Sequence, residues 1–370
     1  MQEPGAFFSP TAALPQARAH ASQTAIALWL FACCAMIFLM VVLGGITRLT
    51  MSGLSITEWQ PLSGVIPPLT HAEWMAEFAR YQAIPQYHAL PSGMTLAQFK
   101  WIFFWEYLHR LWGRLIGLVY ALPFFYFLMR RRLPKRLVPP LFGILVLGGA
   151  QGALGWYMVE SGLVHRVTVS QYRLVAHLAL ALLIYAAILW VALGIVRGPA
   201  RAAPAPGWRR AAEAILALVA VTIAAGGFTA GLHAGLVYNT FPLMDGRLVP
   251  AGYARLHPFL RNWFENVAAV QFDHRLLAMA TLSAIALVFA AGVRAQLPRP
   301  ARTALRVLFA AALAQVALGI STLLLVVPIP LAVAHQAGAV LLLSAAILFR
   351  HTLRAPGAAA VMDAPAALPI

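Results

Sequence analysis

The chain has 370 residues, of which 61% are hydrophobic and only 10% are charged. Soluble domains carry about a quarter charged residues, so this composition excludes an ordinary soluble protein and indicates a polytopic membrane protein. The formal net charge of +16 does not indicate a nucleic-acid partner, because the basic residues gather in short connections between apolar segments.

Apolar segments of roughly 20 residues follow one another along the chain, and each is long enough to cross the hydrocarbon core as a helix. We count eight of them, at residues 24–45, 102–129, 138–158, 173–196, 212–232, 267–292, 304–327 and 331–350. The strands of a membrane barrel would instead alternate in polarity over about ten residues. The sequence therefore predicts an all-α polytopic membrane protein with eight transmembrane helices.

Lys and Arg residues cluster in the second, fourth and sixth connections between these segments. The clusters are Arg130, Arg131, Arg132, Lys135 and Arg136; Arg197, Arg201, Arg209 and Arg210; and Arg294, Arg299, Arg302 and Arg306. By the positive-inside rule, these connections and both termini face the cytoplasm. No transit segment rich in Arg and Ser precedes the first span, so we expect a multi-pass protein of a bacterial inner membrane.

Short motifs recur in the same order in the two halves of the chain, which indicates an internal duplication. The pairs are GGITRLTMSGL from Gly44 with GGFTAGLHAGL from Gly226, HR at His109 with HR at His274, AQGALG from Ala150 with AQVALG from Ala314, and LVAH ending at His177 with AVAH ending at His335. We predict two pseudo-symmetric four-helix bundles in parallel orientation, at residues 24–196 and 212–353. Residues 197–211 form a cytoplasmic linker, and residues 1–23 and 354–370 form cytoplasmic tails.

Each even-numbered span contains one histidine, and the four are His109, His177, His274 and His335. The even spans all run inward, so the four imidazoles are expected at a similar depth near the outer face. An ionisable residue inside a span is a functional candidate, and the alternative for each is a histidine that only packs against a neighbouring helix. Two histidines per half are too few for zinc and match the axial ligands of one haem iron.

Residues around these histidines fit a porphyrin. A small residue follows each histidine by one turn and leaves room for a flat macrocycle: Gly113, Ala181, Ala278 and Ala339. Such residues are also frequent elsewhere in this Ala-rich chain, so they support the interpretation without carrying it. Arg110, Arg114 and Arg275 are candidates to pair with haem propionates, and the alternative is that their side chains reach to the polar interface.

One acidic residue breaks the match between the two halves. Glu106 precedes His109 by three residues and shares its helix face, whereas Gln271 occupies the corresponding position before His274. We therefore predict that the chemistry takes place in the first half with Glu106 as the catalytic residue, and that the second half holds an electron-transfer haem. An ion pair between Glu106 and Arg110 is the alternative interpretation.

Four longer motifs resemble those of the haem A synthase family, and more narrowly its proteobacterial and mitochondrial branch. They are GGITRLTMSGLSITEWQPLSGVIPP (44–68), WEYLHRLWGRLIG (105–117), AGLVYNTFPLMDG (234–246) and FENVAAVQFDHR (264–275). The resemblance runs from about residue 24 to residue 353. It implies an oxidoreductase that oxidises the C8 methyl of haem O to a formyl group and so makes haem A for cytochrome c oxidase.

The resemblance also implies residue roles. His109 and His177 would ligate the iron of the substrate haem, with Glu106 beside the reacting methyl, while His274 and His335 would ligate a haem b. The implied partners are haem O and haem A, membrane lipid, haem O synthase, cytochrome c oxidase assembly factors and a second copy of the chain. Another branch of the family has two cysteines in an outer loop, and this sequence has none there.

Two other classes of function explain part of the same pattern. A di-haem b-type protein that transfers electrons from a quinol would use all four histidines but gives Glu106 no role. A transporter would use the intramembrane polar residues as a substrate path and would bind no porphyrin. A visible spectrum separates the transporter from the other two classes, and mass identification of haem O and haem A separates the synthase from the cytochrome.

Overall fold

The computed structural model describes residues 13–60, 63–89, 93–163, 167–197 and 206–354, and the side chains of residues 13–22 are not described. Most of the two predicted tails and most of the predicted linker therefore lie outside the described residues. Within the described ranges, eight helices are long and apolar enough to cross a membrane and no strand is present. The prediction of an all-α polytopic membrane protein is confirmed.

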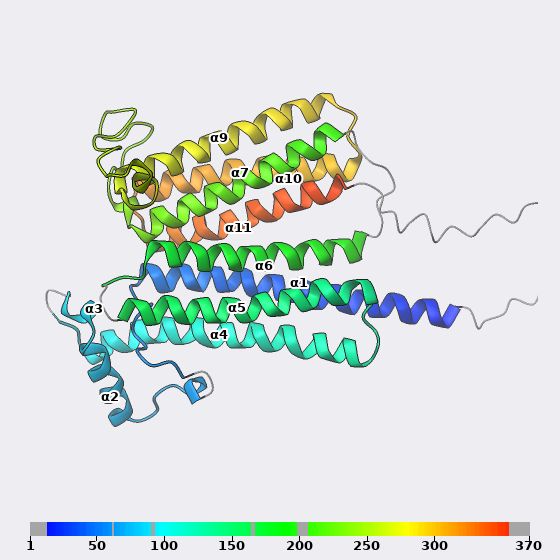
Figure 1. Ribbon diagram of the computed structural model, residues 1–370. Helices are drawn as coiled ribbons and strands as arrows, with labels where there is room; N and C mark the ends of the chain where they lie inside the picture. The colour runs from blue at the N-terminus through cyan, green and yellow to red at the C-terminus, as the bar shows by residue number, and fades with distance from the viewer. Residues whose placement is uncertain (1–12, 61–62, 90–92, 164–166, 198–205, 355–370) are drawn as a thin grey trace, which may run out of the picture.

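The long helices lie side by side and run roughly parallel to one another (Figure 1). They are α1 (Ala13–Leu49), α4 (Leu96–Met129), α5 (Val138–Leu163), α6 (Gln171–Arg197), α7 (Pro206–Gly231), α9 (Val267–Arg294), α10 (Arg299–Leu324) and α11 (Ile329–Thr352). Most of them extend beyond the predicted spans by a few residues at one or both ends. A helix can continue past its apolar stretch because polar residues of the interface also support helical backbone.

Helix α10 ends at Leu324, three residues before the end of the predicted span. Val326 and Val327 have left-handed φ angles of 60° and 58°, and the amide of Val327 donates to the carbonyl of Thr322 at 2.8 Å. This is the hydrogen-bond pattern of a Schellman turn, which ends a helix. The prediction of the end of this span was wrong because the apolar sequence continues through a backbone reversal that hydropathy does not detect.

The loop between α1 and α4 forms a small folded cap on the start of α4. It contains α2 (His71–Gln82), which begins with a capping box of Thr70 and Glu73, and α3 (Pro85–His88). The cap and the first turns of α4 share a buried apolar cluster of Leu54, Phe78, Tyr81, Ile84, Phe99, Ile102 and Phe103. This cluster holds the residues just after α1 against α4, where several candidate site residues lie.

Two sets of four helices make corresponding contacts (Figure 1). We call α1, α4, α5 and α6 the first group and α7, α9, α10 and α11 the second group. Helix α1 contacts α4 and α6, and α5 contacts the same two helices; likewise α7 contacts α9 and α11, and α10 contacts the same two. Thr47 of α1 donates to the carbonyl of Trp105 at 3.4 Å, and Thr229 of α7 donates to the carbonyl of Val270 at 3.3 Å. These matched contacts support the predicted duplication, and the division into two halves stays a prediction.

Helices from both groups meet at the centre of the molecule, where α1 and α6 contact α11 and α6 contacts α7. Gln336 of α11 donates to the carbonyl of Val41 at 2.8 Å, and the hydroxyls of Tyr185 and Ser344 lie 2.7 Å apart. Polar groups that meet in this way inside a membrane protein satisfy each other where no water is present. The centre of the molecule is thus joined by hydrogen bonds as well as by apolar packing.

The first prediction concerns the orientation of the chain in the membrane. The α1–α4 cap and the loop before α9 lie at one end of the helices, and the C-terminal end of α11 lies at the other (Figure 1). Single cysteines placed in residues 46–100 or 233–266 should react with an impermeant thiol reagent from outside the cell. Cysteines placed in residues 130–136 or 294–306 should react only after the cells are opened, because these connections carry the Lys and Arg clusters. The reverse pattern of labelling would contradict the predicted orientation.

Candidate functional site

Each of the four intramembrane histidines packs its ring against a glycine of a neighbouring helix. A Cβ atom added to that glycine would lie only about 3 Å from the Cε1 atom of the ring. The pairs and distances are Gly44 with His109 (3.2 Å), Gly155 with His177 (3.0 Å), Gly226 with His274 (2.9 Å) and Gly319 with His335 (2.8 Å). All four glycines belong to the repeated motifs, so the repeats place the four imidazoles in equivalent surroundings.

Two glutamines lie beside the histidines of α6 and α11. Gln151 of α5 donates to the backbone carbonyl of His177 at 3.0 Å, and its Nε2 lies 3.3 Å from the ring Nε2. Gln315 of α10 donates to the backbone carbonyl of His335 at 2.9 Å and lies 3.2 Å from the ring Nδ1. Both glutamines belong to the repeated AQGALG and AQVALG motifs, which from the sequence alone indicate a duplication and no role for the glutamines.

A cavity of about 650 Å³ lies inside the first group of helices, and its volume is in the usual range for small-molecule sites. Residues of α1, α4, α5 and α6 line it, among them His109, His177, Glu106, Gly113 and Ala181. The structure thus brings together the two histidines, the carboxylate and the small residues that the sequence predicts for this half.

Several residues that line this cavity have a buried polar atom without a hydrogen-bond partner among the described residues, namely Oε1 of Gln86, Nδ1 of His109, Oε1 of Gln151 and Nδ1 of His177. Buried polar atoms in folded proteins are nearly always paired, so such a group points to a missing partner. Two imidazoles that pack against glycines and line a mostly apolar cavity fit an iron porphyrin held through the two histidines.

The second pair of histidines lies in the other group of helices. The ring centroids of His274 and His335 are 6.5 Å apart, with 82° between the ring planes. Nδ1 of His274 lies 3.2 Å from the carbonyl of Thr222, and a donated hydrogen bond there leaves Nε2 as the metal-binding nitrogen. These residues also fit an axially held haem.

Glu106 is only 2% exposed and accepts hydrogen bonds on both carboxylate oxygens. Oε2 accepts from the Ser55 hydroxyl at 2.7 Å and from the Ile56 amide at 2.8 Å. Oε1 accepts from Arg110 Nη2 at 2.6 Å and from its Nε at 3.1 Å. The ion pair with Arg110 is therefore present, and Glu106 lines the cavity at the same time.

Gln271 is also 2% exposed, but its surroundings have the opposite polarity. Its Nε2 donates to the carbonyl of Ala234 at 2.8 Å and to that of Val237 at 2.6 Å. The loop after α1 thus offers two donors to residue 106, whereas the loop after α7 offers two acceptors to residue 271. Each side chain matches its own loop, so Glu106→Gln does not reproduce the environment of Gln271.

The three candidate propionate-binding arginines donate to backbone carbonyls of the outer loops. Arg110 binds the carbonyls of Ile56 at 2.8 Å and Glu58 at 3.2 Å, and Arg275 binds those of Tyr238 at 2.6 Å and Thr240 at 2.8 Å. Arg114 binds the carbonyl of Gln60 at 2.8 Å. Two of them clamp equivalent segments after α1 and α7.

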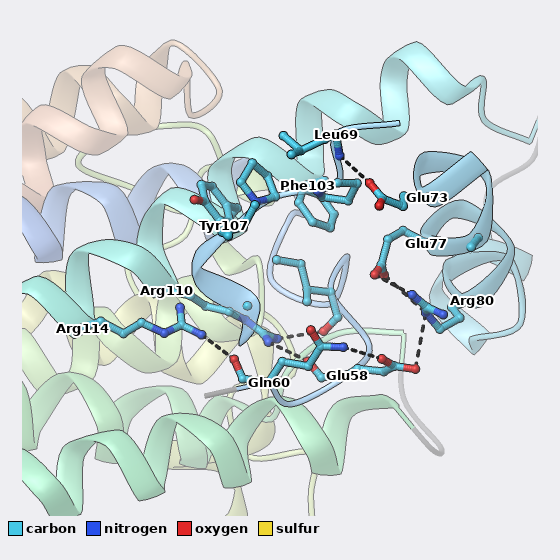
Figure 2. A pocket seen from close by; sticks show the side chains of 16 residues that line it. Glu58, Gln60, Leu69, Glu73, Glu77, Arg80, Phe103, Tyr107, Arg110 and Arg114 are labelled. Carbon is cyan, nitrogen blue, oxygen red and sulfur yellow. Dashed lines mark hydrogen bonds and ion pairs between the residues drawn. The ribbon is translucent and has the colours of Figure 1, made fainter. Parts of the chain in front are cut away.

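Figure 2 shows Arg110 and Arg114 directed toward the loop that contains Glu58 and Gln60. Both arginines line the large cavity and also a smaller one of about 290 Å³ under the α2 cap. The carboxylates of the smaller cavity are already engaged, because Glu77 pairs with Arg80 and Glu73 caps the start of α2. Of the two cavities the larger one contains the histidines, so it is the candidate reaction site.

The fold and the site define a polytopic helical membrane protein with a histidine-lined cavity inside one group of four helices. The chain belongs to the cytochrome oxidase assembly protein family, whose model matches residues 27–347.

Several similar proteins are named heme A synthase. That of Nitrosospira multiformis is 51% identical over 353 residues, which cover 94% of this chain and 99% of the relative. That of Granulibacter bethesdensis is 52% identical over 357 residues, which cover 96% and 93%. That of Rhodospirillum centenum is 51% identical over 346 residues, which cover 93% and 92%. The resemblance to the haem A synthase family is confirmed over nearly the whole chain.

The second prediction concerns the buried ion pair. Glu106→Gln or Arg110→Gln should each lower the free energy of unfolding by about 3–5 kcal/mol, because the remaining partner stays buried without its counter-charge. The control is Glu77→Gln, which breaks a more exposed pair with Arg80 and should cost at most about 1 kcal/mol. Thermal unfolding in one detergent compares the three variants. Equal loss of stability in all three would contradict the importance given to burial.

Proposed function

We propose that this protein is a haem A synthase, an integral-membrane oxidoreductase that converts the C8 methyl of haem O to a formyl group. The observation that carries the proposal is the cavity in which His109, His177 and Glu106 meet. The curated relatives, about 50% identical over most of both chains, support it. A di-haem cytochrome would use the same histidines but would give no purpose to an open cavity with a carboxylate.

In this proposal His109 and His177 bind the iron of the substrate haem from α4 and α6. Gly44 and Gly155 let the two rings lie close to the neighbouring helices, and Gln151 supports the backbone of His177. The positions of the two imidazole rings are therefore set by packing against the neighbouring helices. A rigid site of this kind holds the reacting methyl in one place, which lowers the entropic part of the barrier.

Glu106 would act on the substrate as a fixed negative charge. Two successive two-electron oxidations would turn the methyl into an alcohol and then a gem-diol, and the gem-diol would lose water to give the aldehyde. Each of the two oxidations would develop positive charge at the methyl carbon. A carboxylate that accepts four hydrogen bonds cannot take up a proton without giving up one of them. We therefore propose electrostatic stabilisation of the transition state as its role in preference to proton transfer.

The second pair of histidines, His274 and His335, would hold a resident haem b. When bound, this haem supplies one-electron transfer. Thr222 fixes the ring of His274 through its carbonyl, and Gln315 supports the backbone of His335. The neutral Gln271 places no charge beside this site, which suits a haem that carries electrons and is not itself modified.

The cellular setting follows from the same proposal. We place the protein in a bacterial inner membrane with both termini in the cytoplasm, because the Lys and Arg clusters lie at that end and the named relatives are bacterial. Haem O synthase and assembly factors of cytochrome c oxidase are the expected partners. A membrane-soluble substrate explains why the site lies within the helices.

The third prediction separates the two histidine pairs. His274→Ala or His335→Ala should remove the low-spin spectrum of haem b, because an axial ligand is lost. His109→Ala or His177→Ala should keep that spectrum and abolish formation of haem A. His71→Ala, in an exposed position of the α2 cap, is the control and should change neither. Loss of the resident spectrum in His177→Ala with retention in His335→Ala would show that the halves are reversed.

The fourth prediction isolates the charge of Glu106 from its structural role. Per molecule of folded protein loaded with haem b, Glu106→Gln should make haem A at least tenfold more slowly, which corresponds to about 1.4 kcal/mol of transition-state stabilisation. Arg110→Gln breaks the same ion pair but keeps the carboxylate, so it should lose less activity.

Extraction of haems followed by chromatography and mass identification measures both variants. An equal loss of activity in Glu106→Gln and Arg110→Gln would show that Glu106 acts only as the partner of Arg110. Near-normal haem A in Glu106→Gln would remove the catalytic role altogether.

A further inference from the structure

Two further basic residues line the large cavity, and they come from opposite groups of helices. Arg48 lies in the last turn of α1, and His233 follows the end of α7. Nη1 of Arg48 donates to the carbonyl of Ala230 at 3.1 Å, which ties the end of α1 to the end of α7. The wall of the cavity is therefore completed by residues of the second group.

Arg48 differs from Arg110 in its partners. Arg110 is engaged by the carboxylate of Glu106 and by two loop carbonyls, whereas the Arg48 guanidinium donates to the carbonyl of Ala230. Among the residues that the structure describes, no carboxylate forms an ion pair with Arg48. A guanidinium in an apolar cavity without a counter-charge is suited to an anionic ligand.

His233 is a second side chain that could bind an anionic ligand. Its backbone is left-handed, with φ of 52°, in the turn that closes α7. Burial, and to a smaller extent the charge of Arg48, lower the pKa of His233 below its usual value. The imidazole is therefore neutral at neutral pH, and a bound carboxylate would oppose both effects and stabilise its protonated, hydrogen-bonding form.

Both residues depart from the internal repeat, as Glu106 does. When GGITRLTM from Gly44 is matched with GGFTAGLH from Gly226, Arg48 corresponds to Ala230 and Met51 corresponds to His233. Arg48 therefore has no basic counterpart in the second copy, and His233 has none in the first. Both basic groups line the first cavity, where the substrate is proposed to bind.

We propose that Arg48 and His233 together bind a propionate of the substrate haem and so fix which edge of the porphyrin faces Glu106. This inference rests on the proposed function. Haem O carries two propionates on adjacent pyrroles, and each of these pyrroles also carries a methyl group, one of them the C8 methyl. An anchor on a propionate excludes in-plane rotations of the macrocycle that would turn a pyrrole without a propionate toward Glu106, so it keeps a propionate-bearing edge and its methyl at the carboxylate.

The test compares a porphyrin that has free propionates with one that lacks their charge. Purified full-length protein that retains its haem b is titrated with iron protoporphyrin IX and, separately, with its dimethyl ester. The wild-type protein should bind the free acid at least tenfold more tightly than the ester. The double variant Arg48→Gln/His233→Gln should lose that preference, because its affinity for the acid falls while its affinity for the ester stays unchanged.

Two control variants make the comparison specific. Arg173→Gln removes an arginine of α6 that stacks on Tyr157 and does not line the cavity, so it should keep the preference for the acid. His109→Ala should abolish the binding signal of both porphyrins, which places that signal in the first cavity. These readouts need no turnover, so failure of the wild-type protein to make haem A would overturn the proposed function alone.

Three results would overturn the inference. The first is equal affinity of the wild-type protein for acid and ester, and the second is an equal loss of both affinities in the double variant. The third is loss of the preference in Arg114→Gln with its retention in the double variant, which would place the propionate near α4. With haem O as substrate, a double variant that still places the formyl group on a single methyl at the wild-type rate would also count against the inference.

Discussion

The positions of the four histidines depend on close contact between helices at four glycines. At each of these contacts an imidazole occupies the space that a side chain would otherwise fill, so the ring and the neighbouring helix set each other's place. Protein interiors are packed so closely that a methyl group added at one of these glycines would clash with the imidazole ring. Because the same contact recurs in both groups of helices, two similar histidine pairs arise at matched places in the fold.

The two groups differ in the polar residues around this common frame. Glu106 faces a hydroxyl and an amide, whereas Gln271 faces two carbonyls. Inside a membrane such groups must be satisfied by protein, since no water competes for them. Whether an acid or an amide fits therefore depends on both the helix and the loop that covers it. Glu106 introduces a carboxylate in the first group, whereas Gln271 is neutral in the second.

Much of the fold and part of the site could be predicted from the sequence. Hydropathy located the eight spans, and His109 and its three counterparts stood out because ionisable residues are rare in spans. The end of α10 was missed because a left-handed Val326 continues the apolar sequence through a turn.

The hydrogen bond of Glu106 with Ser55 and that of Arg48 with Ala230 were missed for a different reason. Their partners, Ser55 and Ala230, lie 51 and 182 residues away in the chain, and no local pattern records such a meeting.

The hydrogen bonds of Arg110 and Arg275 to their covering loops limit which substitutions each of the two places can accept. Each arginine donates to the loop that covers its own helix. The same loop also contacts the side chain four residues before the arginine, Glu106 in one case and Gln271 in the other. A helix turn and its covering loop therefore depend on each other, and a substitution in one of them alone leaves hydrogen-bonding groups that do not match. A carboxylate at position 271, for example, would face the carbonyl oxygens of Ala234 and Val237.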